Sequence, residues 1–425
     1  MSMSTILILL LFAAMVLFFI QCVTELNLQM DAGYVFGFSI FFDLIGHFYK
    51  LYVPGNSLFL LLAVPVLPVL YCLFQRPTDS WDIVKDQGIW LWFLFFGYSI
   101  VSLSWAVNDS SGLVKEQILF IHGVIPGVYT YIVYKKYGKF SWTVVALFGL
   151  AYAIAHLALG GYTAEYPGRL TLPGGNPIFD ARMSLIAVAV SLWGRNIPLF
   201  VRLVTIGVAM TSAIYTQSRG PLVAFVIANL IGLLIIGVNK YRKGELKAYY
   251  SYFQLAFVAI IVSGIAASFF TTQITDWIGG SRFAVLVDKG QLEGDDNFTG
   301  RLDLQLKALG KLEQYPYFGT GLGGNTPTVA RDFPHNIVLE IGSELGFVGL
   351  FLWGLALTVS MWAVKRNTIL VVLLLQTLGS ALVSGDFGFN YEYILVAFVS
   401  LAFLPKREAR GAGNNEKAAV PNYRA

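Results

Sequence analysis

The sequence predicts an all-α polytopic membrane protein with about twelve transmembrane helices. Of the 425 residues, 56% are hydrophobic and only 13% are charged, whereas about a quarter of a soluble domain is charged. Apolar runs of about 20 residues, enough to cross a bilayer, recur along the chain. Lysine and arginine gather in alternate loops between these runs, as expected of a multi-pass protein. The mean hydropathy of +0.66 agrees with this class.

The elements follow from the apolar runs, taken in order. The first run lacks the basic start and small-residue cleavage site of a signal peptide, so we expect it to be retained as a helix. Cys22 and Cys72 lie at the ends of apolar runs and indicate no disulfide. The predicted spans are 5–22, 57–74, 88–106, 116–134, 141–160, 178–194, 197–216, 219–238, 250–270, 337–363, 368–384 and 389–404.

Basic residues orient these spans. With twelve spans, all the basic loops and the N-terminus face the cytoplasm. Segment 34–52, which contains Asp43 and His47, then lies in the outer face or re-enters it. If this segment crosses, there are thirteen spans and the N-terminus is outside. The basic groups are Arg76 with Lys85, Lys135 with Lys136 and Lys139, Arg195 with Arg202, Lys240 with Arg242, Lys243 and Lys247, Lys365 with Arg366, and Lys406 with Arg407 and Arg410.

The chain forms one membrane domain, 1–404, which includes a large outer loop at 271–336. Residues 405–425 are polar and glycine-rich, and we expect a disordered cytoplasmic tail. Within the outer loop, residues 300–314 have the periodicity of an amphipathic helix. Its apolar stripe consists of Leu302, Leu306, Leu309 and Leu312.

Two other features of this loop have simple explanations. Residues 319–324 contain a G-x-G-x-x-G pattern, but no strand precedes it, so it does not indicate a dinucleotide site. We expect instead a flexible loop whose backbone approaches a ligand. Glu293, Asp295 and Asp296 have no histidine nearby in the sequence, and we expect them to be solvated rather than to bind a metal.

Arginines on the outer side are the first candidate site residues. Arg169 and Arg219 lie in short outer loops, where positive charges are depleted, and Arg182 falls inside the following span. They indicate either an anion site at the outer face or a structural role by snorkelling or ion pairing.

Arg219 has the strongest case for an anion site. Ser218 can cap the next helix and Pro221 fits its first turn, so Arg219 stands at an outward-facing helix N-terminus that suits phosphate. Arg301 lies in the first turn of 300–314 and either joins this site or is solvated.

His335 is the second candidate. It follows Pro334 at the start of an outward-facing apolar helix, where the helix dipole disfavours the imidazolium form. The ring can therefore accept a proton near neutral pH. Asn336 or Glu340 is placed to orient the ring or an acceptor. The other histidines, His47, His122 and His156, lie in apolar surroundings and are expected to be packing residues.

Several short motifs in this order resemble the O-antigen ligase and polymerase superfamily. The resemblance spans about 160 to 365 by motif and the whole chain by topology. The motifs are Pro167-Gly168-Arg169-Leu170, Gly175-Asn176-Pro177, Gln217-Ser218-Arg219-Gly220, Thr299-Gly300-Arg301, Pro316-Tyr317-Phe318-Gly319-Thr320-Gly321, Pro334-His335-Asn336-Ile337-Val338-Leu339-Glu340, Glu344-Leu345-Gly346 and Gly349.

The resemblance implies a metal-independent membrane glycosyltransferase of GT-C-like fold in the bacterial inner membrane, without a cofactor. Such enzymes transfer a glycan from undecaprenyl pyrophosphate at the periplasmic face to a hydroxyl of another glycan or of the lipid A-core. By position, His335 would be the general base, and Arg219 and Arg301 would hold the pyrophosphate, with Arg169 a weaker correspondence. A chain-length regulator is a further partner that the resemblance allows; nucleic acid is not a partner.

The short, glycine-rich stretch from Arg301 to His335 slightly favours a polymerase over a ligase. Two other functions remain open at this stage. A transporter of an anionic solute would also place arginines in the membrane, although it predicts midplane charges and repeat symmetry. A non-catalytic scaffold of a polysaccharide export complex would tolerate replacement of both His335 and Arg219.

Overall fold

The computed structural model describes residues 31–42, 86–242, 296–325, 333–365 and 367–403, and these are mostly helical. The elements are α2 (Ala32–Ile40), α6 (Gln87–Ser102), η1 (Leu103–Trp105), α7 (Asp109–Leu119), η2 (Phe120–Val124), α8 (Ile125–Tyr137), α9 (Trp142–Leu159), β1 (Gly161–Tyr162), β2 (Leu170–Thr171), α10 (Pro177–Trp193), α11 (Leu199–Tyr215), α12 (Arg219–Arg242), α16 (Asp296–Gln314), α17 (Ile337–Val364), α18 (Thr368–Val383) and α19 (Tyr391–Ala402).

The predicted spans that fall on described residues all coincide with helices, with η2 joining α7 and α8 into one continuous segment. Five of the described segments are long and apolar enough to cross a membrane, and three shorter helices, α11, α18 and α19, are also apolar. The chain is therefore an all-α, multi-pass membrane protein, as predicted. The count of twelve stays a prediction, because the runs 5–22, 57–74 and 250–270 lie outside the described residues.

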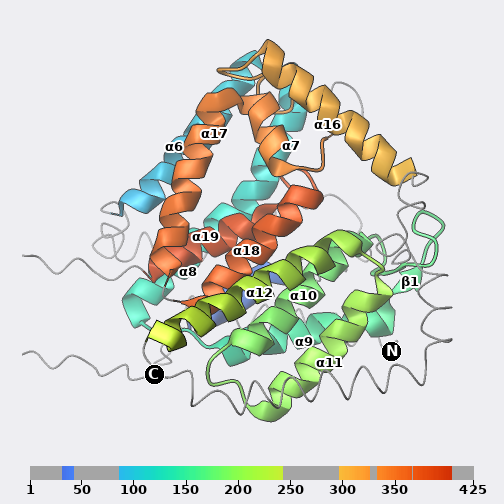
Figure 1. Cartoon of the computed structure of the whole chain (residues 1–425), viewed down its shortest axis with the longest axis vertical. Helices are drawn as coiled ribbons and strands as arrows, with labels where there is room; N and C mark the ends of the chain where they lie inside the picture. The colour runs from blue at the N-terminus through green and yellow to red at the C-terminus, as the bar shows by residue number, and fades with distance from the viewer. Residues whose placement is uncertain (1–30, 43–85, 243–295, 326–332, 366, 404–425) are drawn as a thin grey trace, which may run out of the picture.

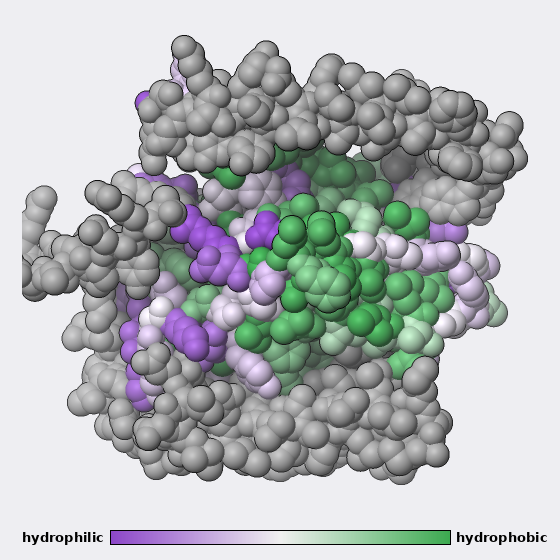
Figure 2. All heavy atoms as spheres, turned by 90° about the horizontal axis from the view of Figure 1, so that it is seen from below, coloured by the Kyte–Doolittle hydropathy of each residue, from purple (hydrophilic) through white to green (hydrophobic). Residues whose placement is uncertain are grey.

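The core is built around α19. Every residue of this helix is buried, and it contacts α8, α17, α18 and η2 (Figure 1). One face of the described helices is apolar: Figure 2 shows a broad hydrophobic area with hydrophilic residues at its edge. The helix α12 exposes Leu230, Leu233 and Leu234. Such a surface suits contact with lipid rather than water.

The described basic loops gather at one end of the molecule. The carbonyl of Asn196, beside Arg195, accepts a hydrogen bond from Thr143 Oγ1 at 3.0 Å, next to the loop that carries Lys139. Phe403, at the end of α19, stacks on Tyr134 of α8 with ring centroids 4.3 Å apart. These contacts join the loops to which the sequence assigns the cytoplasmic side.

The helix α2 departs from the predicted outer position of segment 34–52. Asp31 accepts hydrogen bonds from the backbone N–H groups of Gly33 and Ser141, both at 2.8 Å, and Ala32 N donates to Lys139 O at 3.0 Å. The helix therefore starts beside the basic loop and runs along α9. The composition of the segment indicates that it is apolar, but it does not indicate which helices and loops the segment packs against. This placement favours the thirteen-span alternative, although residues 43–52 lie outside the described part.

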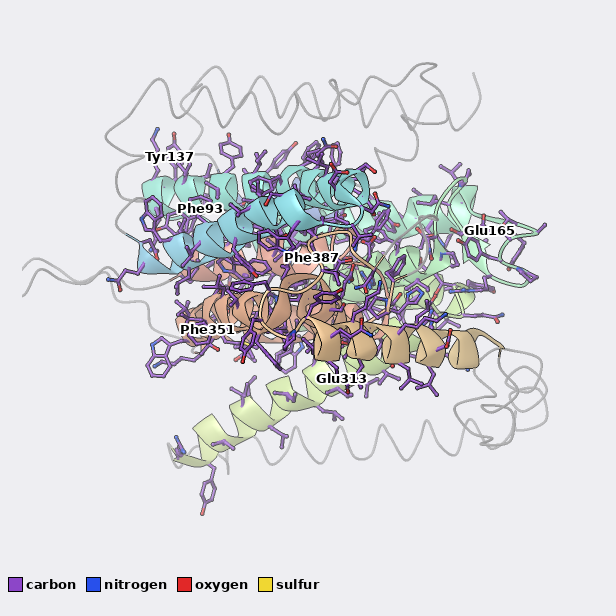
Figure 3. The ribbon with its side chains drawn as sticks, turned by 90° about the horizontal axis from the view of Figure 1, so that it is seen from above. Phe93, Tyr137, Glu165, Glu313, Phe351 and Phe387 are labelled. Carbon is purple, nitrogen blue, oxygen red and sulfur yellow. The ribbon has the colours of Figure 1, made fainter. Side chains whose placement is uncertain are left out.

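The opposite end carries α16, the β1–β2 hairpin and the loops before α17 and α19 (Figure 1). The predicted amphipathic helix is confirmed as α16, which packs against α17. Leu302, Leu306 and Leu309 are exposed, and within the predicted stripe Leu312 lies against α17, where a Cβ on Gly342 would be 3.2 Å from its Cδ2. Figure 3 shows Glu165 on the hairpin at the edge of the molecule, Glu313 on α16, and Phe387 among the helices.

Candidate functional site

The C-terminal end of α18 is the point where the candidate residues converge. The last carbonyl groups of a helix have no intrahelical donor and must find other partners. Arg182 of α10 donates from Nη2 to Ser380 O at 3.1 Å and to Ser384 O at 2.7 Å. Arg301 of α16 donates from Nη1 to Val383 O at 3.1 Å. Two guanidinium groups thus bind the negative end of one helix, an electrostatically favourable arrangement.

Arg219 reaches the same place from α12. A Cβ atom placed on Gly220 would lie 2.9 Å from Cγ2 of Val383, so the start of α12 abuts the last residue of α18. Arg219 is the first residue of α12 and is half-buried. The structure therefore brings the start of α12, with Arg219, to the helix end that binds Arg301.

The turn before Arg219 is held by Arg169. Arg169 is 6% exposed, and it donates from Nε to Thr216 O at 2.9 Å and from Nη2 to Ser218 Oγ at 2.6 Å. The Ser218 hydroxyl in turn donates to Pro177 O at 2.8 Å, and its predicted role as a helix cap stays a prediction. Arg169 thus ties the outer hairpin to the turn that presents Arg219.

His335 stands just outside the first turn of α17. Its φ is +52°, a left-handed conformation, and its ring packs on Phe333 with centroids 4.4 Å apart. Nδ1 is buried and makes no hydrogen bond within the described part of the chain. Burial, and then the positive charges of Arg301 and Arg182, lower the pKa of His335 to about 4. A pKa of about 4 leaves the ring neutral at pH 7, the state that we expected, with burial as the larger cause and the two arginines as the smaller ones.

The two residues predicted to support His335 serve α17 itself. Asn336 is the N-cap of α17, and its Oδ1 accepts from the N–H groups of Val338 at 3.0 Å and Leu339 at 3.2 Å. Glu340 is fully buried and pairs with Lys115 of α7, Nζ to Oε1, at 2.5 Å. Both residues therefore fix the start of the helix that follows His335.

Part of this region is similar to a known protein family. Residues 203–354 match the family model described as O-antigen ligase. We call residues 203–354 the O-antigen ligase domain, after the family model that they match. This match confirms the resemblance seen in the motifs and supports the O-antigen ligase and polymerase superfamily, whose members are glycosyltransferase-like enzymes. No curated protein matches the chain.

The O-antigen ligase domain contains Arg219, Arg301 and His335, since it runs from α11 into α17. The helix end on which they converge lies beyond it, in α18, and Arg182 lies before it, in α10. The site is thus completed by parts of the chain outside the matched domain.

The glycine run of the O-antigen ligase domain is a packed joint, not the flexible ligand loop that we expected. Residues 319–325 are buried. A Cβ on Gly321 would lie 2.4 Å from Ala106 Cα, and one on Gly323 would lie 2.3 Å from Asn108 O. The positive φ angles of these glycines permit this close packing, so the sequence indicated the need for glycine but not its purpose.

One buried polar network was missed by sequence reasoning. Asp180 of α10 accepts from Tyr152 Oη at 2.6 Å, Thr171 Oγ1 at 2.7 Å and Leu172 N at 3.1 Å. His156, interpreted as a packing residue, lies 2.8 Å from Ser212 Oγ through Nδ1. This network fixes the hairpin that carries Arg169. The sequence signal for this network was Asp180, an acidic residue within an otherwise apolar helix.

Proposed function

We propose that the chain is a membrane glycosyltransferase that moves a glycan from undecaprenyl pyrophosphate to an acceptor hydroxyl at the periplasmic face of the bacterial inner membrane. The observation that carries the proposal is the half-buried position of His335 at the start of α17, where burial and the charges of Arg301 and Arg182 lower its pKa. The start of α12, which carries Arg219, packs against the end of α18 to which Arg301 donates. The O-antigen ligase domain supports the reaction class.

The chemistry needs a base on one side of the sugar and positive charge on the other. Pyrophosphate is already a good leaving group, so its departure needs charge stabilisation more than a strong acid. Arg219 and Arg301 supply this charge in our proposal, and guanidinium groups suit phosphate oxygens. Because arginine meets the charge, the proposed reaction requires no metal ion.

His335 takes the proton of the acceptor hydroxyl in this scheme. The hydroxyl oxygen forms the new bond to the anomeric carbon as the bond to the pyrophosphate oxygen breaks. Attack from the face opposite the leaving group inverts the anomeric configuration. A base in this position contributes about 10²–10⁴-fold to the rate.

The other predicted site residues have indirect roles in the proposal. Asn336 and Glu340 hold the start of α17, and thereby His335. Arg169 was predicted to bind pyrophosphate. Since its guanidinium is buried against Thr216 and Ser218, we propose that it positions Arg219 instead.

The acceptor distinguishes a polymerase, which extends a lipid-linked repeat, from a ligase, which uses the lipid A-core. The short segment between Arg301 and His335 slightly favours the polymerase. A chain-length regulator is then a natural partner, and both substrates are lipid-anchored in the bilayer.

A deletion strain that expresses wild type or His335→Ala tests the proposal. The lipopolysaccharide is separated on a gel, and membrane levels of both proteins are matched by immunoblot. Loss of all polymer from the core indicates a ligase, and a single-repeat band indicates a polymerase. An unchanged ladder from His335→Ala contradicts the role of His335 as base, and normal solute transport by the variant in proteoliposomes would favour a transporter.

A further inference from the structure

A buried lysine, Lys115, lies at the centre of a charged cluster next to the proposed site. It sits on α7, is 3% exposed, and binds two acids of α17: Glu340 Oε1 at 2.5 Å and Glu344 Oε1 at 2.8 Å. Glu340 and Glu344 are one helical turn apart, on the same face of α17. Lys115 therefore separates two buried carboxylates that would otherwise repel each other.

The cluster extends to the loops on either side of α17. Glu344 accepts backbone hydrogen bonds from Gly323 N at 3.0 Å and Asn325 N at 3.1 Å. On the other side, a Cβ on Gly388 would lie 2.8 Å from Lys115 Cα, so the loop between α18 and α19 packs directly on the lysine. Asp386 of that loop adds a third acid near the ammonium group. One cation thus joins α7, the start of α17 and two loops.

The start of α17 needs such an anchor because the helix is broken. Gly346 has φ +67° and ψ −168°, which interrupts the helix between residues 337–345 and 347–364. Phe347 N donates to Pro316 O at 2.7 Å and Val348 N to Tyr317 O at 3.2 Å, so loop carbonyls satisfy the donors freed by the break. The short segment 337–345, which follows His335, is therefore not held in place by the long span alone.

We propose that Lys115 is a positioning residue for His335. It fixes segment 337–345 through Glu340 and Glu344, and it ties this segment to the glycine run and to the loop after α18. The part of this inference that concerns enzyme activity rests on the proposed function; the part that concerns the placement of His335 does not. Lys115 is too deeply buried to contact substrate.

The test compares purified, lipid-reconstituted wild type with Lys115→Met and Lys115→Met/Glu340→Gln. The matched control is Lys307→Met, which removes an ammonium group from an exposed pair on α16, Lys307 with Asp303 at 2.6 Å. Two quantities are measured. The first is the rate at which diethyl pyrocarbonate modifies His335, followed by peptide mass spectrometry. The second is kcat and KM for transfer from lipid-linked glycan extracted from the strain's own membranes.

We expect Lys115→Met to be modified several-fold faster at His335 and to lose about 10²-fold in kcat with little change in KM, as for a misplaced catalytic group. Lys307→Met should match wild type in both measurements. In the double variant Glu340 no longer contributes a charge, and the remaining acids, Glu344 and Asp386, both accept backbone hydrogen bonds that can stabilise them. We therefore expect Lys115→Met/Glu340→Gln to recover part of the kcat and the slower modification.

An unchanged modification rate in Lys115→Met overturns the inference, even if activity falls. A double variant as impaired as the single one also overturns it, because the effect is then not one of charge. If wild type transfers no glycan, the proposed function fails, and the modification rates still decide the positioning role. If Lys115→Met does not accumulate, Glu344→Gln replaces it: faster modification of His335 supports the inference, and an unchanged rate overturns it.

Discussion

The two parts of α17 on either side of Gly346 differ in burial and in polarity. Segment 337–345 is largely buried and carries Glu340, Ser343 and Glu344, all with buried polar partners. Segment 347–364 is apolar and exposes Phe347, Phe351 and Trp362. Figure 3 shows Phe351 at the edge of the described helices and Phe387 among them. One continuous apolar run therefore contains a lipid-facing span and a protein-buried support for His335.

Substitution of the glycine between these parts should have the largest effect. A Cβ on residue 346 would lie 2.3 Å from Tyr317 O, and the left-handed φ costs an L-residue a further ~1–2 kcal/mol. We expect Gly346→Ala to lose most of the folded protein from the membrane. The measurement is the fraction that elutes as a monodisperse species in detergent.

Gly354, in the second part of the same helix, provides the matched control. Nothing described lies within 4 Å of a Cβ placed there. Gly354→Ala should be neutral, or more stable by ~0.5–1 kcal/mol. Equal yields of the two alanine variants would contradict the distinction between the two parts of the helix.

Truncation of apolar side chains should separate the two parts by a smaller amount. Ile341 is 1% exposed and Phe351 is 68% exposed. Ile341→Ala should lower the free energy of unfolding by about 2–5 kcal/mol. Phe351→Ala should change it by no more than about 0.5 kcal/mol, as for a surface site. Thermal unfolding in one detergent checks both, and a larger loss for Phe351→Ala would mean that another segment covers it.

The smallest expected effect is a shift in pH dependence. Because burial and two arginines lower the pKa of His335 to about 4, kcat/KM should stay level from neutral pH to about pH 5 and fall only below it. The free energy of unfolding changes in the same direction. Because the pKa of His335 is higher in the unfolded chain, protonation favours unfolding, and stability falls as the pH decreases from about 6.5 through 4.

Arg301→Gln removes a positive neighbour and should move this acidic limb of the pH profile to higher pH by less than one unit, since burial is the larger cause. Lys307→Gln, on the same helix, should leave the limb in place. A wild-type limb centred near pH 6.5, the ordinary histidine value, would show that His335 is solvated during turnover.

The sequence predicted the helices, because these follow from apolar runs; the outward position of His335 stays a prediction. The sequence could not predict that Lys115 pairs with Glu340, since the two residues are 225 positions apart, one just before and one within a run that looks like an ordinary span. Nor could it predict the break at Gly346, because a single glycine in an apolar helix is common. The placement of Arg182 at the end of α18 depends on tertiary packing in the same way.

The hydrogen bonds from Arg182 and Arg301 to the last carbonyl groups of α18 also constrain the order in which the protein assembles. Arg182 and Arg301 precede α18 in the chain, and the carbonyl groups that they bind, on Ser380, Val383 and Ser384, are synthesised after both of them. Until α18 is in place, the guanidinium groups of Arg182 and Arg301 lack these acceptors. The site can therefore assemble only after α18 has been synthesised, and a chain that ends before residue 380 lacks these acceptors.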